Sequence, residues 1–179
     1  MIDTIFSSVV RKYNIDDPLM KGWAYEQYDK DKFNLPSPFR IEMTEIPTNL
    51  AANYADITDK ILVDLNVSDT HAAFITNIIL SVLEKGDSMD RCNTLPSHYT
   101  ATHYISGDDA DIFYHPARNL LTLCTPNLPE WSSATSLYIN EGDVIVHPSY
   151  LEYNTPPVKK QRVAAVSYTH LTLPTSDLV

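Results

Sequence analysis

The spacing of apolar residues divides the chain into two parts that meet near residue 71. In the first part, residues 1–70, a helical period covers residues 49–65, with apolar side chains at Leu50, Tyr54, Ile57 and Ile61. Asp17 and Pro18 suit the N-cap and first turn of another helix, which is predicted to run through Trp23 and Tyr28. Alternating stretches at residues 1–15 and 39–46 predict two strands.

From residue 71 to residue 165 the pattern changes to short alternating or β-branched stretches. Strands are predicted at residues 74–83, 99–105, 111–114, 120–124, 136–139, 144–146 and 161–165. Three of the four glycines precede an Asp between such stretches, which predicts turns with positive φ at Gly86, Gly107 and Gly142. The pattern as a whole predicts one α+β, mainly β domain over residues 1–165, with an antiparallel sandwich or barrel as its core.

Composition and charge exclude several classes of protein. The 23 acidic and 13 basic side chains give a net charge of -10, which argues against nucleic acid as a partner. Four glycines do not supply a Gly-rich phosphate loop. Cys92 and Cys124 make no disulfide framework, and no apolar run reaches the roughly 18 residues of a membrane helix. We therefore expect a cytoplasmic protein that binds neither nucleic acid nor membrane.

The last fourteen residues have a second interpretation. Residues 166–175, VSYTHLTLPT, match the translation of a sequencing-library adapter in one reading frame. We therefore expect residues 166–179 to be an artefact of sequencing and the natural domain to occupy residues 1–165. An adapter in the chain also predicts a metagenomic source.

A motif near the C-terminus carries a family resemblance. Residues 142–149 read GDVIVHPS, a Pro-rich turn follows at residues 156–157, and Arg162 opens the last predicted strand. Together with residues 84–105 and 111–116, this pattern resembles the 2-oxoglutarate/Fe(II)-dependent dioxygenases of phage and marine bacteria. The resemblance implies a double-stranded β-helix, a jelly-roll relative of the cupins, with the N-terminal helices packed on one side.

The resemblance also implies where the site residues lie. In this family two His and one carboxylate hold Fe(II), and an Arg binds the far carboxylate of 2-oxoglutarate. Arg162 takes the position of that Arg. The three metal positions fall on Cys92, Thr94 and Tyr153, none of which is a His or a carboxylate. The metal triad is therefore not expected to be intact, and whether the chain is an enzyme stays open.

Other residues could bind a metal in place of the missing ligands. Backup candidates are His98, His103 and His147; the last takes a position that is commonly Phe in the family, which favours a structural role. His98 and His103 lie five residues apart, so they would face opposite sides of an extended strand. His115 also precedes a proline. A cation cluster at Asp108, Asp109 and Asp111 is less favoured than a solvated turn, because no Glu follows at EF-hand spacing.

Two functions remain. The first is a degenerate, phage-encoded relative that holds no iron and serves as a binding or assembly module, with a small anionic ligand or a protein as its partner. The alternative is an active hydroxylase that uses Fe(II) and 2-oxoglutarate with relocated ligands, such as Cys92 with a nearby His or Asp.

Overall fold

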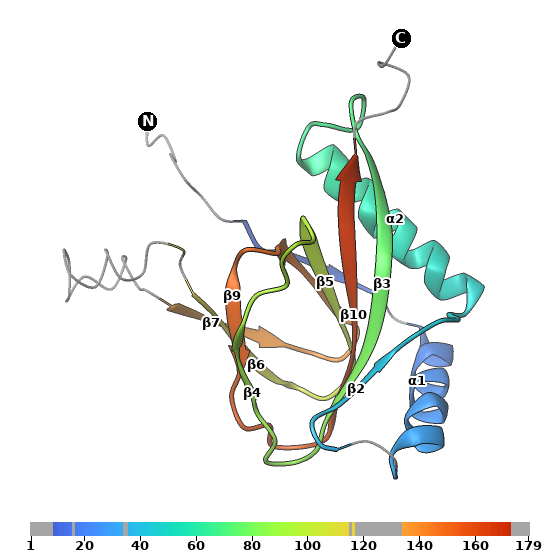
Figure 1. The fold of residues 1–179 in the computed structure, drawn as a ribbon, viewed down its shortest axis with the longest axis vertical. Coiled ribbons are helices and arrows are strands. Elements are labelled where there is room, and N and C mark those ends of the chain that lie inside the picture. Colours follow the sequence, from blue (N-terminus) through green and yellow to red (C-terminus); the bar gives the residue numbers. More distant parts are fainter. Residues whose placement is uncertain (1–8, 16, 34–35, 115, 117–133, 173–179) are drawn as a thin grey trace, which may run out of the picture.

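The computed structural model describes residues 9–15, 17–33, 36–114, 116 and 134–172. Its elements, in chain order, are β1 (Arg11–Asn14), α1 (Pro18–Asp31), β2 (Phe39–Glu42), α2 (Thr48–Asp64), β3 (Ala72–Leu83), β4 (Met89–Cys92), β5 (Tyr99–Ser106), β6 (Asp109–Tyr114), β7 (Ala134–Ile139), β8 (Asp143–Pro148), β9 (Glu152–Thr155) and β10 (Arg162–Thr172). The prediction of a mainly β protein with two helices and antiparallel sheets is confirmed (Figure 1).

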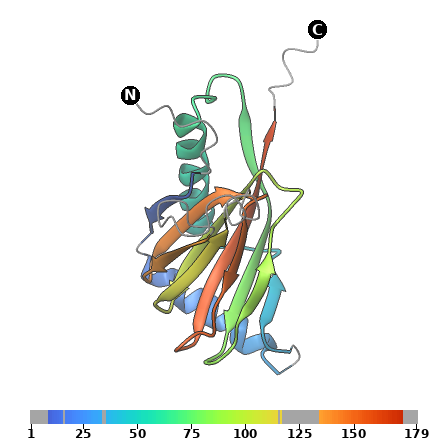
Figure 2. The same cartoon turned by 90° about the vertical axis from the view of Figure 1, so that its left-hand side faces the viewer.

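The strands form two antiparallel sheets. The larger sheet has the order β1-β8-β5-β10-β3-β2, and the smaller sheet has the order β4-β9-β6-β7. From β3 to β10 the chain changes sheet at every step except between β6 and β7 (Figures 1 and 2). As a result, strands far apart in the sequence become neighbours: β4 pairs with β9, and β3 pairs with β10.

Both helices pack on one face of the larger sheet. The carboxylate of Asp17 accepts a hydrogen bond of 3.0 Å from the Leu19 amide, so α1 begins with the predicted cap. Met20 of α1 and Leu50 of α2 are buried against apolar residues of β3 and β10. Full burial of one such side chain stabilises the fold by roughly 1.5–3 kcal/mol. Within the described residues, no helix combines the length and apolar character that a membrane span needs.

The other face of the larger sheet packs against the smaller sheet. A buried cluster joins side chains of both sheets: Tyr104, Phe113, Ile139, Ile145, Leu151, Tyr153 and Ala164. On β10, Val163 and Ala165 lie with the helices, whereas Ala164 lies between the sheets. Because side chains alternate along a strand, Arg162 also faces the space between the sheets.

The glycine turns follow the prediction. Gly86, Gly107 and Gly142 have φ angles of 93°, 96° and 85° and connect β3 to β4, β5 to β6, and β7 to β8. A side chain at Gly107 would also meet the backbone of Arg162, 3.1 Å from its Cβ position.

Several strands differ from the prediction. The last strand continues from Ala165 to Thr172, because residues 166–172 pair with β3 and, as far as Thr169, with β5. The origin of residues 166–179 stays a prediction, since pairing does not test it. The second strand ends at Glu42 rather than at residue 46, and neither β4 nor β9 was among the strands predicted from the pattern. The strand predicted at residues 120–124 lies outside the described residues.

Candidate functional site

Arg162 and Asp111 form an ion pair between the two sheets. Nη1 of Arg162 lies 2.8 Å from Oδ1 of Asp111, and Nη2 lies 3.4 Å from Oδ2. The two residues are 5% and 0% exposed. The guanidinium group therefore meets a carboxylate from the protein itself, in the two-pronged geometry that Arg uses for carboxylates.

Neighbouring hydroxyl groups complete the hydrogen bonding of this pair. Thr155 accepts a bond of 2.7 Å from Nη2 of Arg162 and donates one of 2.7 Å to Oδ1 of Asp111. The Tyr104 hydroxyl donates to Oδ2 of Asp111. Burial disfavours the charge of Arg162, but the Asp111 carboxylate raises the pKa of Arg162 above its ordinary value. The pair is thus buried, and both side chains are hydrogen-bonded to their neighbours.

The free space beside this pair is very small. A cavity of about 10 Å³ is lined by Arg162 and Asp111 and also by Arg40, Thr102 and Tyr153. One water molecule needs about 10–15 Å³ by the same measure. The residues around Arg162 therefore do not fit 2-oxoglutarate, since the guanidinium group is already paired and a dicarboxylic acid has no room.

Cys92 and Tyr153, which the resemblance matches to two of the three metal positions, are cross-strand neighbours in β4 and β9. Tyr153 is 3% exposed, and its ring stacks on Phe113 at 5.6 Å between centroids. Burial raises the pKa of the Tyr153 phenol and of the Cys92 thiol, although Arg40 lowers both to a smaller extent. Protonated phenol and thiol groups are poor ligands for Fe(II).

Thr94, at the third metal position, is bonded to its neighbours. Its amide donates to the Ser149 carbonyl oxygen at 3.0 Å, and its hydroxyl is hydrogen-bonded to the Thr100 hydroxyl. A neutral hydroxyl engaged in this way does not supply the carboxylate that the triad needs. The donor set at Cys92, Thr94 and Tyr153 therefore does not fit iron.

The three backup histidines lie in three different places. His147 is 1% exposed and lies between the sheets, where its ring meets Phe113 and Tyr153. His103 is buried on the other face of the larger sheet, with Nδ1 3.2 Å from the Tyr54 hydroxyl. His98 is exposed and lies before β5 rather than in it. The structure does not bring these side chains together.

Burial decides the protonation of the two buried histidines. It lowers the pKa of His103 and of His147 to about 4, so both rings are neutral near pH 7. Among the described residues, no three His, Cys, Asp or Glu side chains are grouped so that they could hold a metal ion. His115 and Cys124 lie outside the described residues.

The three aspartates at the start of β6 do not form a cation site. Asp108 pairs with Lys160 at 3.3 Å, and Asp109 pairs with Lys159 at 3.8 Å. Asp111 faces the interior and pairs with Arg162. The three aspartates therefore have separate partners. The predicted solvated turn fits the exposed Asp108, whereas Asp111 is buried.

A larger pocket opens beside the small cavity. It has a volume of about 510 Å³, and we call it the Arg40 pocket; its walls are Arg40, Thr76, Asn77, Cys92, Asn93, Thr94, Leu95, Pro96, Ser97, Tyr168 and His170. Its residues come from β2, β3, β4, the β4–β5 connection and β10. The sequence carried no signal for Arg40, because an exposed Arg on a short strand is ordinary.

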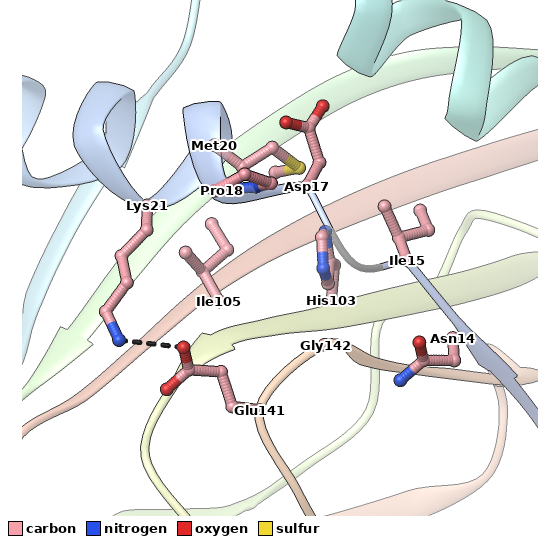
Figure 3. Close-up of a pocket in the computed structure, with 10 residues that line it drawn as sticks. All are labelled: Asn14, Ile15, Asp17, Pro18, Met20, Lys21, His103, Ile105, Glu141 and Gly142. Atoms are coloured by element: carbon pink, nitrogen blue, oxygen red, sulfur yellow. Dashed lines mark hydrogen bonds and ion pairs between the residues drawn. The ribbon is translucent and has the colours of Figure 1, made fainter.

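A further pocket of about 430 Å³ lies where α1 begins, on the helix-covered face of the larger sheet (Figure 3). Figure 3 shows His103 between Ile15 and Ile105, and Lys21 joined to Glu141. This Lys–Glu distance is 2.7 Å. Lys21 and Glu141 pair with each other, and Asp17 accepts hydrogen bonds from the Leu19 amide and from Asn49, so this pocket offers a ligand less than the Arg40 pocket does.

No protein-family model matches this sequence, and no curated protein matches it. Solved structures do match its fold. AviO1 from Streptomyces viridochromogenes has a TM-score of 0.64 and 10% identity, with 94% of this chain and 91% of that chain covered. HygX from Streptomyces hygroscopicus, with nickel and 2-oxoglutarate bound, has a TM-score of 0.60 and 10% identity, with 94% and 84% covered.

A prolyl-4-hydroxylase from Pseudomonas putida has a TM-score of 0.58 and 11% identity, with 92% of this chain and 93% of that chain covered. The fold is that of the 2-oxoglutarate/Fe(II) oxygenases. The resemblance carried by the GDVIVHPS motif is confirmed at this level. At such identities the likeness establishes the fold alone.

Proposed function

We propose that this chain is a non-catalytic relative of the 2-oxoglutarate/Fe(II) oxygenases that serves as a binding module and uses neither iron nor 2-oxoglutarate. The shared fold supports the proposal. The chain also passes between the two sheets at nearly every step from β3 to β10. This supports a double-stranded β-helix or jelly roll, in which such passage is typical.

One observation carries the proposal: the carboxylate of Asp111 forms an ion pair with the guanidinium group of Arg162. In the oxygenases that the motif resembles, the matching Arg binds the cofactor's carboxylate. Here an internal carboxylate makes that contact in a space of about 10 Å³. A side chain of the protein thus replaces the cofactor, and the substituted metal positions are in keeping with a site that no longer needs iron.

Anaerobic titration of the purified protein with Fe(II) and 2-oxoglutarate tests the proposal. We expect no metal-to-ligand absorption band, because the residues at Cys92, Thr94, Tyr153 and Arg162 fit neither iron nor 2-oxoglutarate. An absorption band together with near-stoichiometric iron would overturn the proposal.

Stepwise restoration of the site gives a sharper test. The triple variant Cys92→His, Thr94→Asp, Tyr153→His should bind Fe(II) but show no 2-oxoglutarate band, since Asp111 still pairs with Arg162. Adding Asp111→Gly should then produce the band.

The matched control adds Asp109→Gly to the same triple variant, because Asp109 lies on the same strand but pairs with Lys159. A 2-oxoglutarate band already in the triple variant, or an equal gain with Asp109→Gly, would show that Asp111 does not block the site. Near-ultraviolet circular dichroism confirms that each variant is folded.

An active oxygenase with relocated ligands is the second candidate, and His147 favours it. Nδ1 of His147 lies 2.9 Å from the Pro148 carbonyl oxygen, and Nε2 is buried without a hydrogen-bond partner among the described residues. Metal-binding histidines are held in this way. Iron binding that is present in the wild type and lost in His147→Phe would favour this candidate.

The partner of the module, its phage origin and its cytoplasmic location stay predictions from the sequence. A small anionic ligand and a protein are both compatible with a binding module of this fold.

A further inference from the structure

We propose that the Arg40 pocket binds a small organic molecule through its carboxylate group, which pairs with the guanidinium group of Arg40. This inference rests on the proposed function, because it assigns a class of ligand to the binding module. The pocket adjoins the small cavity at Arg162, since Arg40 lines both, but Arg162 and Asp111 do not line the pocket. Its volume is about 510 Å³, against about 10 Å³ beside the buried ion pair.

The first argument is the unused charge of Arg40. The other arginines that the structure describes each have an acidic partner: Arg11 with Asp64, Arg91 with Glu152, and Arg162 with Asp111. Arg40 has no such partner within the described residues, and its hydrogen bond to the Tyr168 hydroxyl is long, at 3.4 Å. In a chain with 23 acidic and 13 basic residues, a guanidinium group without a carboxylate is available to an external one.

The second argument is the lining of the pocket. None of its lining residues is acidic, whereas the pocket beside α1 contains Asp17 and Glu141. Hydroxyl and amide groups dominate instead, and the side-chain oxygen of Asn77 is buried without a hydrogen-bond partner among the described residues. An unmade hydrogen bond of this kind is costly unless a water or ligand supplies a donor.

These groups favour a carboxylate over a phosphate. One guanidinium group balances one carboxylate, whereas a phosphate group with its charge of about -1.5 to -2 calls for further positive charge. The neutral hydroxyl and amide groups suit polar substituents on the same ligand, as in a hydroxy acid. Tyr168 and His170 belong to the segment that matches an adapter, so the proposal rests on Arg40, residues 76–77 and residues 92–97.

Cys92 provides a reporter for the charge of this pocket, because its partly exposed thiol lies in the pocket wall. Iodoacetate is an anionic alkylating reagent, and iodoacetamide is its neutral counterpart. With both reagents the sulfur displaces iodide. Peptide mass spectrometry measures the rate at Cys92 separately from that at Cys124.

We expect Arg40→Gln to lower the ratio of the iodoacetate rate to the iodoacetamide rate at Cys92 by about fivefold. This is the attraction of one positive charge for the iodoacetate anion over roughly 8 Å at an effective dielectric constant of about 40. Arg40→Lys should keep most of the ratio, since it keeps the charge. Lys85→Gln is the matched control, because Lys85 is exposed on the β3–β4 turn and does not line the pocket. An unchanged ratio in Arg40→Gln, or an equal fall in Lys85→Gln, would overturn the proposal.

A second measurement tests the class of ligand at constant ionic strength. Lactate should slow the alkylation of Cys92 by iodoacetamide in a saturable way, whereas its neutral analogue lactamide should not. This protection should be lost in Arg40→Gln. Equal protection by both compounds, or stronger protection by inorganic phosphate than by lactate, would refute the assignment of a carboxylate.

The two proposals fail in distinguishable ways. Near-stoichiometric iron with a 2-oxoglutarate band would refute the non-catalytic function, whatever happens at Cys92. Absence of that band together with an alkylation ratio that does not depend on Arg40 would refute the carboxylate pocket alone.

Discussion

Arg162 and Arg40 line the same small cavity, but their surroundings differ. Arg162 is buried and bound by Asp111, Thr155 and the ring of Tyr104, 5.1 Å from its guanidinium carbon. Arg40 is exposed at the edge of a larger pocket and has no acidic partner among the described residues. One guanidinium group is thus part of the interior, and the other is free to meet a ligand.

This difference separates a structural charge from a binding charge. A buried guanidinium group must be paired, because water no longer solvates it, and removing its partner leaves an isolated charge. An exposed guanidinium group keeps its hydration and needs no partner to be stable. The position of an Arg in a family motif therefore does not show which role it has.

The largest expected effect is at the buried pair. Asp111→Ala should lower the free energy of unfolding by about 3–5 kcal/mol, because it leaves the charge of Arg162 buried and unpaired. Urea denaturation measures the loss. The control Asp108→Ala, in the turn before the same strand, should cost less than about 1 kcal/mol, since Asp108 and its partner Lys160 are both exposed.

Added acetate tests whether the missing carboxylate is the cause of this loss, because the space left by the Asp111 side chain can admit a small carboxylate. It should raise the stability of Asp111→Ala by about 1–2 kcal/mol at concentrations well above its dissociation constant and leave the wild type unchanged. A loss below about 1 kcal/mol in Asp111→Ala would show that the pair is not a structural unit.

The next effect is a loss of stability in acid. The pKa values of His103 and His147 are about 4 in the folded protein and about 6.5 in the unfolded chain. The unfolded state therefore binds more protons between these values, and the free energy of unfolding falls as the pH drops from about 6.5 to about 4.

Each histidine contributes up to about 3 kcal/mol to this fall. Thermal denaturation across this pH range measures it. His147→Phe should remove about half of the pH dependence, and a second substitution at His103 should remove most of the rest. A slope that neither substitution changes would mean that burial does not lower the pKa of either histidine.

The smallest effect is at Arg40. Arg40→Gln should change the free energy of unfolding by less than about 0.5 kcal/mol, because the side chain is exposed and without an acidic partner among the described residues. Denaturation by urea provides the measurement, alongside Arg162→Gln, which should cost several times more. Comparable losses in the two variants would remove the distinction between the two arginines.

Elements set by local chemistry were predictable from the sequence. Helix α1 followed from Asp17 and Pro18, because a cap and a fixed φ act over a few residues. The turns at Gly86 and Gly142 followed from the need for positive φ. Strand β9 was not predictable, since its four residues become a strand only by pairing with β4 and β6.

The candidate site divides in the same way. By itself, the sequence determined the local elements, the absence of His and carboxylate at the three matched metal positions, and the place of Arg162 in a motif. Only the tertiary structure decided that Asp111, 51 residues away, pairs with Arg162, and that Arg40 has a pocket beside it. The physical reason is that periodicity shows which face of a strand a side chain occupies, whereas the register and the facing of the sheets decide what it meets.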